Sequence, residues 1–145
     1  MTDQRPALGH RPQATARIVH AAIMVGVLVV FGVFLFLRAR MDPLAAGLAT
    51  PILKWVGLGI LAIAALVSYT IRARIPGPTA NISREQWWAD HFGTALVSWA
   101  VAEGGGLAAI ILGWLAENST VMAAGAAVAL ALLFVTRPGA LEGAV

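Results

Sequence analysis

The chain has 145 residues, of which 59% are hydrophobic and only 12% carry a formal charge. A typical soluble domain has roughly 25% charged residues, and one core of this size could not bury so much apolar surface. The net charge of +3 comes without a basic block, which argues against nucleic acid as a partner. The absence of cysteine excludes disulfides, thiolate chemistry and cysteine-bound metals. Composition therefore indicates an integral membrane protein, whose first partner is the lipid bilayer.

The first apolar run, 18–37, is long enough to cross a bilayer. As a helix with a rise of about 1.5 Å per residue it would be about 30 Å long, which matches the hydrocarbon layer. It follows a polar arm, 1–17, and is closed by Arg38 and Arg40. A cleavable signal peptide is the alternative, but the long arm and the closing arginines favour a retained helix over about 18–40.

The second apolar run, 52–71, predicts a helix over about 52–74. Lys54 lies near its start, where a long side chain can extend to the membrane surface and keep its charge in water. Pro76 follows the run and prevents the helix from continuing, because proline lacks the backbone N–H that a helix needs.

The third apolar run begins after a helix-start signal. Ser83 and Gln86 have the spacing of a capping box, so we expect a helix over about 84–116. Trp87 and Trp88 precede the apolar residues of this helix, where adjacent tryptophans are typical of the interface between lipid and water. We therefore expect both indoles at the membrane surface.

The fourth apolar run is the shortest and predicts a helix over about 120–136. Ser119 and Thr120 are candidate caps for its start, and a short tail, 137–145, follows its end. The four helices would form one domain, 18–136. The predicted fold class is therefore all-α, an integral membrane bundle of four transmembrane helices.

Positive charges predict the orientation, because Lys and Arg concentrate on the cytoplasmic side of a membrane. With four spans, the N-terminal arm, the second connecting loop and the tail share one side, and the first and third loops share the other. Seven positive charges against three place both termini in the cytoplasm. The first side has Arg5, Arg11, Arg17, Arg72, Arg74, Arg84 and Arg137, and the second has Arg38, Arg40 and Lys54.

Glu103 is the candidate functional residue, because it lies in the middle of the third apolar run. A charged carboxylate at the centre of a membrane helix costs about 2.5–3.5 kcal/mol, and burial favours its protonated form. Such a residue is poised to exchange a proton or a cation. Two alternatives stay open: a protonated carboxyl that joins two helices by a hydrogen bond, and a contact with a lipid, pigment or cofactor.

Small residues surround Glu103. Consecutive glycines are unfavourable in a helix, by roughly 1 kcal/mol each relative to alanine, unless another backbone approaches closely. A row of small residues at helical spacing also predicts a tight helix contact, within the chain or between protomers. The predicted packing residues on this helix are Gly104, Gly105, Gly106, Ala95, Ser98, Ala102 and Ala109.

His20, His91 and Asp90 lie near helix starts on the predicted cytoplasmic side. A metal site formed by these three residues is one interpretation, and haem ligation by a histidine is another, but their spacing is not diagnostic of either. We favour solvation of these side chains at the membrane interface. The sequence thus predicts no metal, no cofactor and no catalytic residue.

The middle of the chain has a recognisable order of motifs. A Gly- and Ala-rich run that begins at Gly57 and Gly59 precedes a basic loop, 72–76, and a helix with a central Ala102-Glu103-Gly104 segment. This order resembles the proteolipid c subunit of rotary ATP synthases, a helical hairpin that assembles into ion-carrying rings. The resemblance implies that Glu103 carries the ion and that the two glycines are packing positions. The loop lacks the Arg-Gln-Pro of that family, and the chain is also similar to uncharacterised four-helix bacterial membrane proteins with an Ala-x-x-Glu-Gly pattern.

These features predict a small, proteolipid-like protein of the plasma (inner) membrane, without enzymatic activity. In the first hypothesis, Glu103 handles protons or cations in a homo-oligomer. In the second, the chain is a non-catalytic accessory or structural subunit of a respiratory, photosynthetic or transport complex and contributes only helix packing. Substitution of Glu103 by glutamine separates the two, because glutamine keeps the size and hydrogen bonding but cannot ionise.

Overall fold

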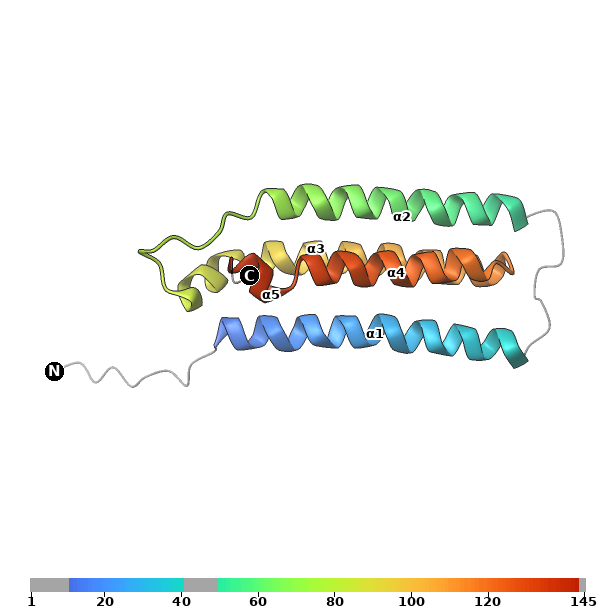
Figure 1. The fold of residues 1–145 in the computed structure, drawn as a ribbon, viewed down its shortest axis with the longest axis horizontal. Helices are drawn as coiled ribbons and strands as arrows, with labels where there is room; N and C mark the ends of the chain where they lie inside the picture. The colour runs from blue at the N-terminus through green and yellow to red at the C-terminus, as the bar shows by residue number, and fades with distance from the viewer. Residues whose placement is uncertain (1–10, 41–49, 144–145) are drawn as a thin grey trace.

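The computed structural model describes residues 11–40 and 50–143, and this described part is all-α. Figure 1 shows the long helices side by side, with α1 and α2 on either side of α3 and α4. The elements are α1 (Pro12–Arg40), α2 (Thr50–Ala73), α3 (Arg84–Leu115), α4 (Ser119–Val135) and the short α5 (Pro138–Leu141).

In the described part of the chain, three helices are long and apolar enough to cross a membrane: α1 with 29 residues, α2 with 24 and α3 with 32. The fourth, α4, is also apolar but has 17 residues, about 25 Å of helix, which is slightly less than a typical hydrocarbon layer. Large hydrophobic side chains cover the outward faces of α1 and α2, and such surfaces are stable against lipid rather than water. They include Ile18, Val25, Leu28, Val29, Val33, Phe36, Ile52, Trp55, Ile63 and Leu66.

The helix α1 begins at Pro12, earlier than the expected start at residue 18, so the end of the polar arm is helical. Proline suits the first position of a helix, because its missing N–H would have no partner there and its φ is already helical. The expected start of the first helix at about residue 18 is therefore wrong, because residues 12–17 of the polar arm already belong to α1. Residues 1–10 lie outside the described part.

The start of α4 is capped by Asn118 and not by the predicted Ser119 or Thr120. The Asn118 side chain accepts a hydrogen bond from the Val121 backbone N–H at 3.1 Å. Glu117, just before it, has a φ of 54°, which turns the chain sharply after α3. The turn is therefore tight, and the helix restarts one residue earlier than the sequence pattern predicts.

Helix α3 packs against α1, α2 and α4, and its contacts with these helices are the most extensive in the bundle. Glycines permit close approach on two of its sides. A Cβ on Gly105 would overlap the Ala64 Cβ of α2, and a Cβ on Gly106 would overlap the Ala129 Cβ of α4. Consecutive glycines thus let α3 contact two helices at the same level of the bundle.

One end of the bundle brings together the starts of α1 and α3, the end of α2, and α5, as Figure 1 shows. Glu142, next to α5, forms ion pairs there with Arg17 and Arg84. At the opposite end, Arg38 donates a hydrogen bond to the Glu117 carbonyl at 2.8 Å. Among the described residues, the first end carries Arg11, Arg17, Arg72, Arg74, Arg84 and Arg137, and the opposite end carries Arg38, Arg40 and Lys54.

Candidate functional site

Glu103 lies in the middle of α3, at the contact with α1. Its side chain is partly exposed, and its carboxylate faces Gly26 of α1, where a Cβ would lie 3.6 Å from Oε1. Within residues 11–40 and 50–143, no hydrogen bond or ion pair engages this carboxylate. In this part of the chain, therefore, nothing fixes Glu103 as an interhelical link, and the carboxyl group can meet a ligand from outside the bundle.

The predicted row of small residues on α3 faces the interior of the bundle. Ala95, Ala102 and Ala109 have no exposed surface, and Ser98 is buried beside them. The Ser98 hydroxyl lies 3.1 Å from the Ser68 hydroxyl of α2, so the two side chains form a hydrogen bond between helices. This row is therefore used for packing within the chain and is covered by neighbouring helices.

The other predicted packing glycines divide into buried and exposed positions. Gly57 is buried, and a Cβ there would lie 3.3 Å from the Leu112 Cβ of α3. Gly59 and Gly104 are exposed, and a Cβ on either would meet nothing within 4 Å. No described helix of this chain therefore packs against these two glycines, and their predicted role in packing stays a prediction for a contact with another protomer.

The outward face of α3 also carries small residues. Gly93, Ala100 and Gly104 are exposed, and their spacing of seven and four residues places them on one side of the helix. Glu103 borders this side. Small exposed residues allow another helix to approach α3 closely, next to the carboxylate.

Trp87 and Trp88 are buried, with 2% and 0% of their surface exposed, so other segments of the chain cover the two indoles, and their predicted level at the membrane interface stays a prediction. The Trp87 indole donates a hydrogen bond to the Pro76 carbonyl at 3.1 Å. The Trp88 indole donates to Glu142 Oε1 at 2.9 Å. The loop after α2 and the C-terminal segment therefore cover both side chains, which a reading of α3 alone could not reveal.

His20 is also buried, and its predicted interfacial solvation is wrong. Its Nε2 lies 2.9 Å from the Leu133 carbonyl oxygen, and because a carbonyl only accepts, this nitrogen carries the hydrogen. The imidazole meets the Trp99 ring edge to face, with centroids 4.9 Å apart. The Trp99 indole in turn donates to the Thr136 carbonyl at 2.9 Å. These contacts join α1, α3 and the end of α4.

We expect Trp99→Phe to lower the free energy of unfolding by roughly 1–3 kcal/mol, because the change removes a buried donor to the Thr136 carbonyl. Trp114→Phe is the matched control: Trp114 is partly exposed and packs edge-on against Phe34. Circular dichroism during unfolding in mild detergent measures both variants. Equal losses would show that ring size, and not the hydrogen bond, accounts for the effect.

His91 and Asp90 do not join His20 in one site. The His91 ring stacks on Trp87 with centroids 4.8 Å apart, and its Nδ1 donates to the Trp87 carbonyl at 2.9 Å. Asp90 is exposed. In the described part of the chain, no group of three His, Asp or Glu residues could hold a metal ion.

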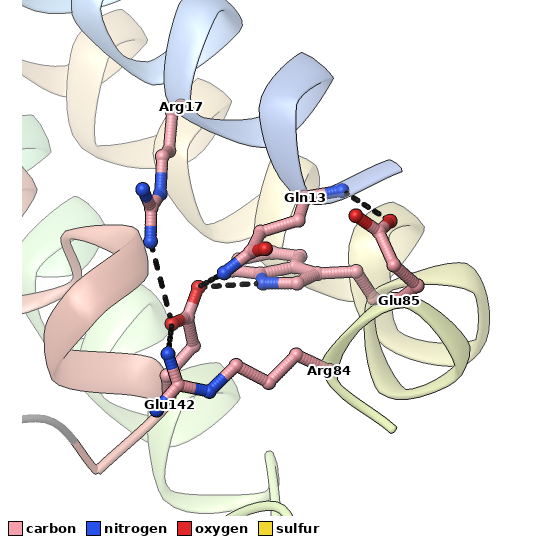
Figure 2. A network of polar contacts seen from close by, with 6 residues as sticks. Gln13, Arg17, Arg84, Glu85 and Glu142 are labelled. Carbon is pink, nitrogen blue, oxygen red and sulfur yellow. Dashed lines mark hydrogen bonds and ion pairs between the residues drawn. The ribbon is translucent and has the colours of Figure 1, made fainter. Parts of the chain in front are cut away.

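A polar network centred on Glu142 lies at the end of the bundle near α5 (Figure 2). The Glu142 side chain is 1% exposed. Its Oε1 accepts hydrogen bonds from Gln13 Nε2 at 3.0 Å and from Trp88 Nε1 at 2.9 Å. Its Oε2 lies 3.6 Å from a guanidinium nitrogen of Arg17 and 3.6 Å from one of Arg84. A tail residue thus links the starts of α1 and α3.

The environment of Glu142 keeps it ionised. Burial raises the pKa of Glu142, but hydrogen bonds from Trp88 and Gln13 and the charges of Arg17 and Arg84 together outweigh burial, so its pKa lies below the ordinary 4.5. The sequence pattern predicted only a short tail over 137–145 and did not predict this network. No local pattern signals it, because Gln13 is 129 positions and Trp88 54 positions from Glu142.

The fold defines a class of protein: an all-α bundle whose long apolar helices are compatible with a membrane. No protein-family model matches the chain, and comparison with curated proteins and with solved structures gives no match.

Proposed function

We propose that this chain is a multi-pass protein of the plasma (inner) membrane in which Glu103 exchanges protons or cations within an oligomer. The observation that carries the proposal is the carboxylate itself. It lies in the middle of an apolar helix, is partly exposed, and has no hydrogen-bond or ion-pair partner among the described residues. A structural link between helices would need such a partner.

The energetics of an apolar environment support an exchange role. An ionised carboxylate in hydrocarbon costs about 2.5–3.5 kcal/mol on insertion scales, and protonation or a bound cation removes most of this cost. Gly26 on α1 and Gly104 on α3 keep the space beside Glu103 free of side chains. A proton donor, a cation or a polar group of a neighbouring subunit can therefore reach the carboxylate without displacing a helix.

The proposed topology has α1 to α4 crossing the membrane and both termini in the cytoplasm. Its support is the clustering of arginines at the end of the bundle that holds Arg17, Arg84 and Glu142. Helix α4 is about 25 Å long, so in this topology the bilayer is slightly thinned around it or its ends are shielded by neighbouring helices.

The α2–α3 pair supports the ion-carrier role that the c-subunit resemblance implies, because these helices pack as an antiparallel hairpin with Gly105 against Ala64. One feature differs from a simple hairpin carrier: Glu103 faces Gly26 of α1. We therefore place the exchange site between α1, α3 and a neighbouring subunit.

The second candidate is a non-catalytic accessory subunit of a larger membrane complex. The observation that favours it is the outward face of α3, where Gly93, Ala100 and Gly104 offer a close-packing surface next to Glu103. In this case Glu103 would bind a polar side chain of the partner, and the chain would move no ion.

Ion flux in reconstituted vesicles tests the proposal. We expect wild-type protein to dissipate an imposed proton or sodium gradient, and Glu103→Gln to reduce flux to background while the native mass of the oligomer is unchanged. Glu117→Gln is the matched control, because Glu117 is an exposed acid beyond the end of α3. Absence of flux from wild-type protein, with capture of other subunits, would favour the accessory role.

A further inference from the structure

A groove lies between α2 and α3 near the arginine-rich end of the bundle. It has a volume of about 280 Å³, slightly below the roughly 300–1,000 Å³ of typical ligand pockets, and it is open to the outside. An open groove suits part of a chain-like ligand better than a compact ligand that must be enclosed. Its lining consists of Ile71, Arg74, Gly93, Thr94 and Val97.

The groove lies at the boundary between apolar and polar surface, and its residues on α2 and on α3 both indicate this level. Ile71 lies in the last turn of α2, and Arg74 follows the end of that helix. Gly93 and Val97 lie where the apolar part of α3 begins. In a membrane-spanning bundle this level is the headgroup region, where acyl chains meet phosphates.

Among the residues that line the groove, Arg74 carries the charge, and Thr94 adds a hydroxyl. Arg74 is exposed, and within residues 11–40 and 50–143 no carboxylate forms an ion pair with it. Asp90, about one turn from Gly93 on α3, does not line the groove. The Arg74 guanidinium can therefore donate two parallel hydrogen bonds to a phosphate, a geometry that arginine favours.

The other side of the groove is apolar and has room. A Cβ on Gly93 would meet nothing within 4 Å, so the glycine leaves the floor of the groove open. Ile71 and Val97 provide aliphatic walls. The acyl chain of a lipid fits these walls, because it moves from the apolar interior of the bilayer to aliphatic side chains of similar polarity.

We propose that this groove binds one anionic phospholipid, with the phosphate on Arg74 and the first part of an acyl chain along Ile71, Gly93 and Val97. The proposal rests on the proposed function only for the insertion of the helices in a membrane. Lipid binding requires no ion movement by Glu103. Arg74 alone, and not the other arginines at this end of the bundle, is expected to bind the phosphate.

Lipid retention measured by native mass spectrometry tests the proposal. The protein is reconstituted into vesicles of equal parts phosphatidylglycerol and phosphatidylcholine and then extracted in mild detergent. We expect wild-type protein to retain phosphatidylglycerol preferentially. Arg74→Gln should reduce that preference about fivefold, the effect expected for one arginine near an anionic headgroup.

Two matched controls define the result. Arg11→Gln removes the same charge from an exposed arginine at the same end of the bundle, outside the groove, and should keep the preference. Gly93→Leu should fill the groove and reduce retention, whereas Gly32→Leu, at an equally open glycine of α1, should not.

Three outcomes would overturn the proposal: equal retention of both lipids by wild-type protein, equal losses in Arg74→Gln and Arg11→Gln, or unchanged retention in Gly93→Leu.

Flotation of wild-type protein with the vesicles reports insertion separately. Protein that floats but shows no lipid preference contradicts the groove alone, and protein that does not float contradicts the proposed function as well. Loss of flux in Glu103→Gln with an intact lipid preference would support both proposals and show that lipid binding does not depend on Glu103.

Discussion

Gly106→Ala should lower the free energy of unfolding by about 1–3 kcal/mol, although it adds a single methyl group. The new Cβ would overlap the Ala129 Cβ and lie 2.9 Å from the Gly125 carbonyl oxygen, both on α4. Neither atom is the end of a flexible side chain, so α3 and α4 would have to move apart along their contact. The higher helix propensity of alanine, roughly 1 kcal/mol, offsets only part of this cost.

Gly104 provides the control for this prediction. Gly104→Ala makes the same chemical change two residues away, but its Cβ would meet nothing within 4 Å, so we expect no loss of stability. Circular dichroism during titration with a denaturing detergent measures both variants. Equal stability of Gly104→Ala and Gly106→Ala would contradict the close approach of α3 and α4.

Glu142→Ala should destabilise the bundle by about 1–3 kcal/mol, because it leaves the buried Trp88 indole without its acceptor. It also removes the acceptor of the Gln13 amide. The two ion pairs add less, because the Arg17 and Arg84 side chains are 59% and 60% exposed and water screens them. Thermal unfolding in mild detergent measures the loss.

Glu142→Gln separates the charge from the hydrogen bonds. The amide oxygen can still accept from Trp88, so we expect a smaller loss than for Glu142→Ala. Glu117→Gln is the control for removing a carboxylate, because Glu117 is exposed and lies at the opposite end of the bundle. If Glu142→Ala and Glu117→Gln are equally stable, the C-terminal network does not contribute to folding.

The pH dependence follows from the lowered pKa of Glu142. A carboxyl with a folded pKa below its unfolded value stabilises the folded state fully above about 4.5, and this contribution is lost as pH falls through the folded pKa. Wild-type protein should therefore lose more stability than Glu142→Gln below about pH 4.5, while the difference between them stays constant above about pH 6. A constant difference through the acid range would contradict the charged state of Glu142.

Features that depend on neighbouring residues were predictable from the sequence. Each apolar run is a local property, and a helix satisfies its own backbone hydrogen bonds, so the long helices follow from composition alone. The cap of α3 is also local: Ser83 Oγ accepts from the Gln86 N–H at 3.2 Å, as the spacing predicts. The position of Glu103 in the middle of α3 follows from the same reasoning.

Features that depend on which helices pack against each other were not predictable from the sequence. The glycines at 104, 105 and 106 look alike in sequence, yet the first is open and the other two touch α2 and α4. Trp88 and Glu142 carry no local sign of their contact, since the chain must fold back before an indole at the start of α3 can meet the tail. The local pattern specifies helices and their apolar surfaces, because those arise within a few residues. The partners of Glu142, the burial of both tryptophans and the side of α1 that faces Glu103 arise only from packing between distant segments.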